Sequence, residues 1–138
     1  MSDSKKFRDW DDRYADSDYL FGTAPNDFLK SVADRLAPNS RILCLADGEG
    51  RNGVYLATLE PKVTAVDHSR VGLEKAKKLA EQKQVSIETI EADLAEYDLG
   101  VESWDCIVSI FFHIPTEVRN HIYPRIITAL KPGGILIL

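Results

Sequence analysis

From Arg41 onward, short apolar runs alternate with longer segments that have the composition of helices. Strands separated by helices predict right-handed crossovers and a parallel sheet with helices on both faces. Strands buried in this way read as continuous apolar runs, as they do here. The runs expected to form strands are 41–46, 62–66, 86–91, 105–111 and 135–138. The helices expected between them are 52–59, 69–82 and 116–130.

Local signals mark the ends of these helices. Ser69 and Thr116 can each cap a helix through the side-chain oxygen. Pro124 lies inside the last helical segment, which predicts a kink or two short helices there. Gly133 and Gly134 are expected to end that helix before the fifth strand begins.

The first 40 residues differ from the rest and predict a helical cap or lid on a core at 41–138, within a single domain. Phe7, Trp10 and Tyr14 have the spacing of one aromatic helix face. A loop follows, and Pro25 can open a second helix at its first position.

Composition excludes several classes of protein. Lys plus Arg total 17 against 22 Asp plus Glu, and this net charge of −5 argues against a nucleic-acid partner. No apolar run is long enough to cross a membrane, and the N-terminus lacks a signal-peptide core, so a cytoplasmic protein is expected. Cys44 and Cys106 lie in strand segments and are expected to be reduced core thiols. No residue cluster has metal-ligand spacing.

A glycine-rich loop follows the first strand, at the edge where ligands bind to sheets of this kind. Gly48, Gly50 and Gly53 satisfy the pattern G-x-G-x-x-G, and Asp67 stands at the end of the second strand. This arrangement matches the dinucleotide-binding fingerprint. An NAD-linked oxidoreductase is therefore one function to consider.

The charge of the loop favours a different ligand. Asp47 and Glu49 would each repel a pyrophosphate by about 1 kcal/mol in water, and Arg51 offsets only part of this. S-adenosylmethionine (SAM) carries a cationic sulfonium and ammonium, which suit an acidic loop. Its single carboxylate can bind the amides at a helix N-terminus.

Acidic residues also follow the second and third strands. Asp67 can accept both hydroxyls of a ribose, which serves NAD and SAM equally, or it can cap the next helix. Asp93 can accept a hydrogen bond from the exocyclic amine of adenine, or it can be a solvated turn residue. His68, beside Asp67, is interpreted as a ribose or adenine neighbour.

Five motifs together resemble the class I SAM-dependent methyltransferases: I-L-C-L-A-D-G-E-G-R-N, V-T-A-V-D, E-A-D-L, W-D-C-I-V-S-I-F-F-H and L-K-P-G-G-I-L-I-L. The stretch W-D-D-R-Y…Y-L-F-G-T-A-P-N-D-F-L is similar to that of small bacterial methyltransferases related to the tellurite-resistance and thiopurine enzymes. The resemblance implies a three-layer α/β/α Rossmann-like fold with strand order 3-2-1-4-5. It also implies SAM as the cofactor and S-adenosylhomocysteine (SAH) as the product.

The resemblance further implies which residues contact the cofactor. They are Ala46, Asp47, Gly48, Gly50 and Asn52 along the methionine part, Asp67 and His68 at the ribose, Asp93 and Leu94 at the adenine, Ser109 near the sulfonium, and Tyr14, Tyr19 and Phe21 in a lid.

Two positions depart from the family pattern. Cys44 stands where the family commonly has an acidic residue, and Ala46 stands where it commonly has glycine. Asp47 is the candidate that supplies the missing negative charge.

Methyl transfer from a sulfonium needs mainly alignment and exclusion of water. A general base is needed only if the acceptor must lose a proton, and His113 is the one placed candidate. The alternative is that His113 binds backbone at the end of the fourth strand.

The resemblance implies two further strands beyond 135–138, so the sheet in this sequence is expected to lack them. An open fifth strand could pair with a second copy of the chain. Three functions therefore stay open: a methyltransferase for a small-molecule acceptor, a SAM-binding module that dimerises through this edge, and an NAD-linked oxidoreductase.

Overall fold

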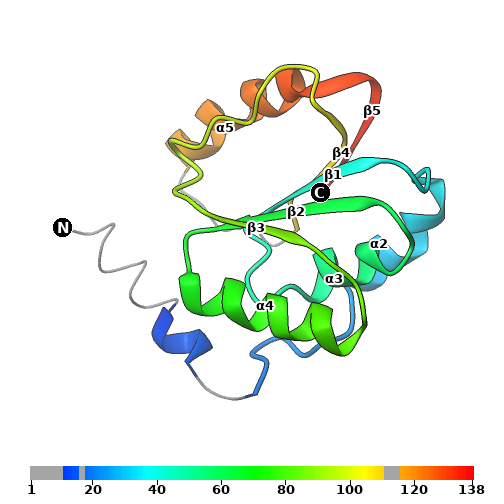
Figure 1. The fold of residues 1–138 in the computed structure, drawn as a ribbon. Helices are drawn as coiled ribbons and strands as arrows, with labels where there is room; N and C mark the ends of the chain where they lie inside the picture. Colours follow the sequence, from blue (N-terminus) through cyan, green and yellow to red (C-terminus); the bar gives the residue numbers. More distant parts are fainter. Residues whose placement is uncertain (1–10, 16–17, 111–115) are drawn as a thin grey trace.

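The computed structural model describes residues 11–15, 18–110 and 116–138. Within them, a parallel sheet has the strand order β3-β2-β1-β4-β5, as Figure 1 shows. This order confirms the predicted fold class. The strands are β1 (Arg41–Leu45), β2 (Lys62–Asp67), β3 (Glu88–Glu91), β4 (Trp104–Val108) and β5 (Leu130–Ile137).

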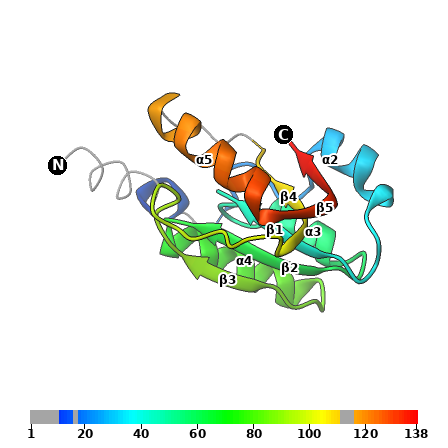
Figure 2. The same ribbon diagram turned by 90° about the horizontal axis from the view of Figure 1, so that it is seen from above.

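Helices cover both faces of the sheet. One face carries α5 (Thr116–Ala129), while α3 (Arg51–Ala57) and α4 (Arg70–Gln82) lie on the other (Figures 1 and 2). The sheet face that carries α3 also packs against α2 (Asp27–Val32). This helix continues into a short 3-10 helix at Ala33–Arg35. Residues 11–14 are helical and lie beside α4 (Figure 1). The three-layer α/β/α arrangement is therefore present.

Each face of the sheet has its own apolar core. Leu29 of α2 and Leu56 of α3 are fully buried against Ile42 and Cys106 on one face. On the other, the α5 residues Ile122 and Ile126, with exposed fractions of 1% and 0%, pack with residues of β1, β2 and β4. Cys44 and Cys106 are buried free thiols, as predicted.

Several element boundaries differ from the sequence predictions: the helix expected at 52–59 spans Arg51–Ala57, and the strand expected at 105–111 spans Trp104–Val108. Pro25 does not open α2, because Asn26 is the N-cap and its side chain accepts a hydrogen bond from the Leu29 amide. The third strand begins at Glu88 rather than Ser86. No helix of the described residues is long and apolar enough to cross a membrane.

The last helix and strand differ more. Pro124 lies inside one continuous helix, since buried Ile122 and Ile126 on either side hold both turns against the sheet. The helix ends at Ala129, before the glycines, and β5 begins directly at Leu130. Gly133 and Gly134 instead lie in an irregularity of β5, where the pairing with β4 shifts register between Trp104 and Cys106. Gly133 has φ 79°, which suits glycine.

Candidate functional site

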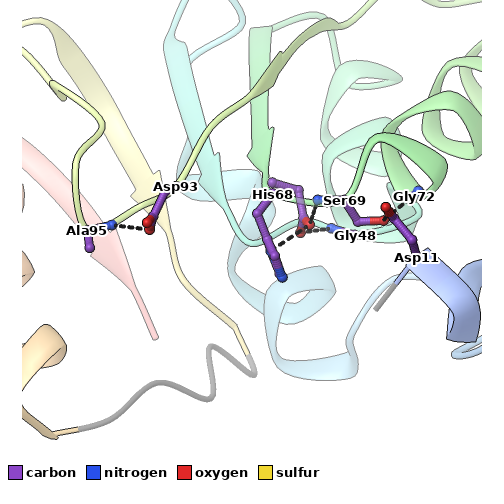
Figure 3. Close-up of polar contacts among 8 residues, drawn as sticks. Asp11, Gly48, His68, Ser69, Gly72, Asp93 and Ala95 are labelled. Carbon is purple, nitrogen blue, oxygen red and sulfur yellow. Dashed lines mark hydrogen bonds and ion pairs between the residues drawn. The ribbon is translucent and has the colours of Figure 1, made fainter. Parts of the chain in front are cut away.

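The ends of parallel strands bring most of the predicted site residues to one edge of the sheet. Ala46 follows β1, and its amide donates to the Val66 carbonyl of β2 at 2.8 Å. The Ala92 amide, after β3, donates to the Asp67 carbonyl at 3.0 Å. Figure 3 shows Gly48, His68 and Ser69 close together, with Asp93 at the neighbouring strand end. This is the edge where ligands bind to sheets of this type.

Asp67 joins the glycine loop to the segment after β2. Its side chain is buried, and Oδ2 accepts a hydrogen bond from the Gly48 amide at 2.9 Å. Oδ1 accepts from the Ser69 amide at 2.8 Å and lies 3.3 Å from Nδ1 of His68. The cap of α4 is Ser69, whose Oγ accepts from the Gly72 amide, so the alternative role of Asp67 as the cap is wrong. An ionised carboxylate can accept about four hydrogen bonds, which leaves capacity for a ligand.

The glycine loop approaches α4 closely. Gly48 and Gly50 have φ values of 57° and 89°, which glycine adopts without strain. Gly50 is the N-cap of α3, and a Cβ added there would lie 2.5 Å from Cβ of Ala76. The loop therefore depends on glycine for its path between the two helices.

The carboxyl group of Asp47 points under the loop toward α3. Oδ1 accepts from the Gly53 amide at 3.2 Å, whereas Oδ2 is buried and has no hydrogen-bond partner. Burial, and then the charge of Asp67, raise the pKa of Asp47 to about 7 against the opposing effects of the Gly53 amide and Arg51. Burial and the nearby Asp47 charge also raise the pKa of the Cys44 thiol. The negative charge of Asp47 therefore disfavours ionisation of the Cys44 thiol.

The charge of Glu49 is balanced within the protein. Glu49 is buried, its Oε2 forms an ion pair with Nζ of Lys75, and its Oε1 accepts from the Leu20 amide at 2.7 Å. The expectation that Glu49 presents its charge to a ligand is therefore wrong. Asp67 pairs with His68, and the charge of Arg51 acts on Asp47.

Ala46 adopts a left-handed backbone conformation with φ 54°. This conformation costs an L-residue about 1 to 2 kcal/mol, and glycine would adopt it without that cost. Ala46→Gly is expected to raise the free energy of unfolding by about 0.5 to 1 kcal/mol, since part of the gain is offset by the flexibility of unfolded glycine. Urea denaturation measures the change, and a decrease in stability would contradict the strain.

The three predicted lid aromatics differ in their surroundings. Tyr14 is buried, and Cβ atoms added to Gly48 and Gly72 would lie 2.6 and 2.9 Å from its ring or hydroxyl. Burial raises the pKa of Tyr14, and the charges of Asp67 and Glu49 add to the effect. Tyr19 packs on α4 instead, where its hydroxyl donates to the Lys75 carbonyl. Phe21 is 55% exposed to solvent.

The remaining predicted residues occupy varied positions. The Asp93 carboxylate accepts from the Ala95 amide at 2.9 Å and shapes the turn after β3 (Figure 3). The Leu94 side chain lies in the core, which leaves only its backbone for a ligand. Ser109 is buried after β4. Asn52 is also buried, and its Oδ1 accepts from the Asn26 amide. His113 lies outside the described residues.

One residue beside the site and one hollow away from it were not predicted from the sequence. Lys75, which pairs with Glu49, was missed by sequence reasoning because a lysine in a Lys-rich helix carries no special signal. A hollow of about 210 Å³ lies at the opposite edge of the sheet, before β4, and is lined by Asp98, Leu99, Gly100, Pro124, Arg125 and Thr128. No group of His, Cys, Asp and Glu in the described ranges could hold a metal ion.

Comparison with known proteins shows which family the chain belongs to. Residues 42–134 match the family described as a methyltransferase domain, and this match includes both the glycine loop and the strand ends. The chain belongs to the methyltransferase domain family. The resemblance to the class I SAM-dependent methyltransferases inferred from the motifs is thereby confirmed.

A sequence relative of this methyltransferase domain is the uncharacterized methyltransferase YodH of Bacillus subtilis (strain 168). The two are 32% identical over 136 residues, which cover 91% of this chain and 56% of YodH. The chain thus spans about half the length of this relative.

Solved structures share the fold of the methyltransferase domain. TehB from Haemophilus influenzae superposes with a TM-score of 0.72 and 26% identity, covering 82% of this chain and 41% of TehB. A SAM-dependent methyltransferase from Geobacter sulfurreducens, solved in complex with SAH, gives a TM-score of 0.69 and 23% identity. That match covers 83% of this chain and 47% of the other.

Proposed function

We propose that this chain is the SAM-binding core of a methyltransferase that acts on a small-molecule acceptor. The observation that carries the proposal is the buried carboxylate of Asp67, which accepts from the Gly48 amide of the glycine loop and lies at the strand end where a ligand would bind. Family membership and the fold shared with SAM-dependent enzymes support it.

Electrostatics favours SAM over a dinucleotide at this loop. The Asp67 carboxylate in a partly desolvated site repels a diphosphate more strongly than it would in water, and Asp47, whose pKa is raised to about 7, adds to this repulsion where it is ionised. The same charges attract the sulfonium and ammonium of SAM. The ion pair between Glu49 and Lys75 leaves the net charge near the loop unchanged, because it withdraws one negative charge and one positive charge together.

The strand ends supply contacts suited to each part of SAM. Asp67 retains acceptor capacity for ribose hydroxyls after binding the Gly48 and Ser69 amides. Asp93 and the Leu94 backbone would hold the adenine. The loop residues Ala46 to Gly50 would lie along the methionine part, and Ser109 would lie near the sulfonium.

Bound SAM would supply an activated methyl group whose transfer expels a neutral thioether. The contribution of this chain is then to orient the cofactor and exclude water. Tyr14, buried over Gly48, contributes an aromatic wall to that purpose. We keep His113 as the proposed base for acceptors that must lose a proton.

A product assay tests the proposed function. The 138-residue chain is incubated with SAM and a panel of small thiols, chalcogen anions, amines and carboxylates, and SAH is quantified. Acceptor-dependent SAH formation is expected for at least one class. Tight SAM binding without turnover of any class would favour the binding-module alternative, and size-exclusion chromatography would then show whether the chain dimerises.

The raised pKa of Asp47 predicts a pH-dependent stability. Its folded pKa of about 7 lies above the ordinary value of 3.8, so the protonated carboxyl is favoured in the fold. That stabilisation is complete below pH 3.8 and is lost as the pH rises through 7. Asp47→Asn keeps an acceptor for the Gly53 amide but cannot ionise.

Asp47→Asn is therefore expected to gain about 2 to 4 kcal/mol relative to the unmodified chain between pH 5 and pH 8.5. Thermal melts of both proteins across this range measure the gain. A constant difference in melting temperature would show that Asp47 does not titrate in this window.

A further inference from the structure

Three polar side chains of the motif G-E-G-R-N bind the N-terminal segment of the chain itself. Oε1 of Glu49 accepts from the Leu20 amide at 2.7 Å. Nη1 of Arg51 donates to the Ala24 carbonyl at 3.3 Å, and Oδ1 of Asn52 accepts from the Asn26 amide at 2.8 Å. The glycines of the motif shape the loop, whereas its charged and amide side chains hold residues 20–26.

Lys75 of α4 extends this attachment to Tyr14, Asp18 and Tyr19. Its Nζ donates to the carbonyl of Tyr14 at 3.1 Å and to that of Asp18 at 2.6 Å. The same ammonium lies 4.9 Å from the centre of the Tyr19 ring, and the Tyr19 hydroxyl donates to the Lys75 carbonyl. A single cation therefore binds this segment at three residues.

The charges of Glu49 and Lys75 are withdrawn from solvent together. Their side chains are 4% and 12% exposed, and they form an ion pair. A buried ion pair adds little net stability, but it fixes one geometry because either partner alone would be an uncompensated charge. The geometry fixed here is that of the N-terminal segment against the glycine loop.

We propose that Glu49 and Lys75 are positioning residues for the cofactor, an inference that rests on the proposed function. The pair binds the backbone at Tyr14, Asp18 and Leu20 and so keeps the Tyr14 ring between Gly48 and Gly72. The side chains of the pair are nearly buried and bind each other rather than face solvent. Their effect on the cofactor is indirect, through the segment that closes one side of the site and excludes water.

The experiment uses Lys75→Met, which keeps the length of the side chain and removes its charge. Glu49→Gln is the milder second variant, since it keeps an acceptor for the Leu20 amide. Lys78→Met is the matched control, because Lys78 is an exposed lysine of the same helix. Hydrogen exchange of the Leu20 amide reports attachment of the segment, and calorimetry with SAH reports cofactor affinity.

Lys75→Met is expected to lose protection at Leu20 and to bind SAH at least tenfold more weakly, while Lys78→Met stays within twofold of the unmodified chain. Glu49→Gln combined with Lys75→Met should bind no more weakly than Lys75→Met alone, because the double variant leaves no unpaired charge.

Two results would overturn the inference in distinguishable ways. Unchanged Leu20 protection and unchanged SAH affinity in Lys75→Met would refute the positioning role and leave the proposed function intact. Failure of the unmodified chain to bind SAH would refute the proposed function, and the inference that rests on it would fall as well.

Discussion

Gly50→Ala is expected to lower the free energy of unfolding by about 3 kcal/mol or more, a large part of the 5 to 15 kcal/mol typical of a domain. The left-handed φ of 89° at Gly50 accounts for about 1 kcal/mol of this loss. The rest comes from packing, because the new methyl group would lie 2.5 Å from Cβ and 2.9 Å from Cα of Ala76. Backbone in the middle of α4 cannot move away as the end of a flexible side chain can.

Gly22→Ala is the matched control for Gly50→Ala. Gly22 also has a left-handed φ of 77°, but a Cβ added there would meet no atom within 4 Å. This variant is expected to lose only the backbone contribution of about 1 kcal/mol. Chemical denaturation of the two variants thus separates conformational strain from helix contact. Equal losses in the two variants would show that α4 does not press on the loop.

Asp67→Asn is expected to weaken SAM binding by at least about 100-fold, or about 2.7 kcal/mol. The substitution removes a negative charge beside the cationic ligand. It also replaces one of two acceptor oxygens by an amide nitrogen, which cannot accept a hydrogen bond. Both oxygens are in use, since Oδ1 and Oδ2 accept from the Ser69 and Gly48 amides. Charge-assisted hydrogen bonds of this kind contribute about 1.5 to 3 kcal/mol each.

Asp98→Asn provides the control for Asp67→Asn. Asp98 is an exposed acid whose Oδ1 accepts from the Gly100 amide at 2.9 Å, at the edge of the sheet opposite the site. SAM affinity is expected to stay within twofold in this variant. Calorimetry measures binding, and thermal melts of both variants show whether the fold is retained. Unchanged affinity in a folded Asp67→Asn protein would remove Asp67 from the site.

The sequence allowed the fold and the location of the site to be predicted because both depend on local patterns. Apolar runs separated by helical segments predicted a parallel sheet, the resemblance to the class I methyltransferases implied its strand order, and Ser69 correctly predicted the start of α4. Residues that follow strands in sequence, such as Asp67 and Asp93, necessarily lie at one edge of a parallel sheet.

Features that depend on contacts between distant residues could not be predicted. The ion pair between Glu49 and Lys75 joins a loop to a helix, and it reversed the role expected for Glu49. Asn52 likewise binds the backbone at Asn26, which is distant in sequence. The continuity of α5 through Pro124 depends on burial of its neighbours against the sheet, which local propensity does not record.

Calorimetric titration of the 138-residue chain with SAM, and separately with NADH, tests the electrostatic account most directly. We predict saturable binding of SAM that is lost in Asp67→Asn, with no detectable binding of NADH. Tight binding of NADH, or an affinity for SAM that does not depend on Asp67, would contradict the account.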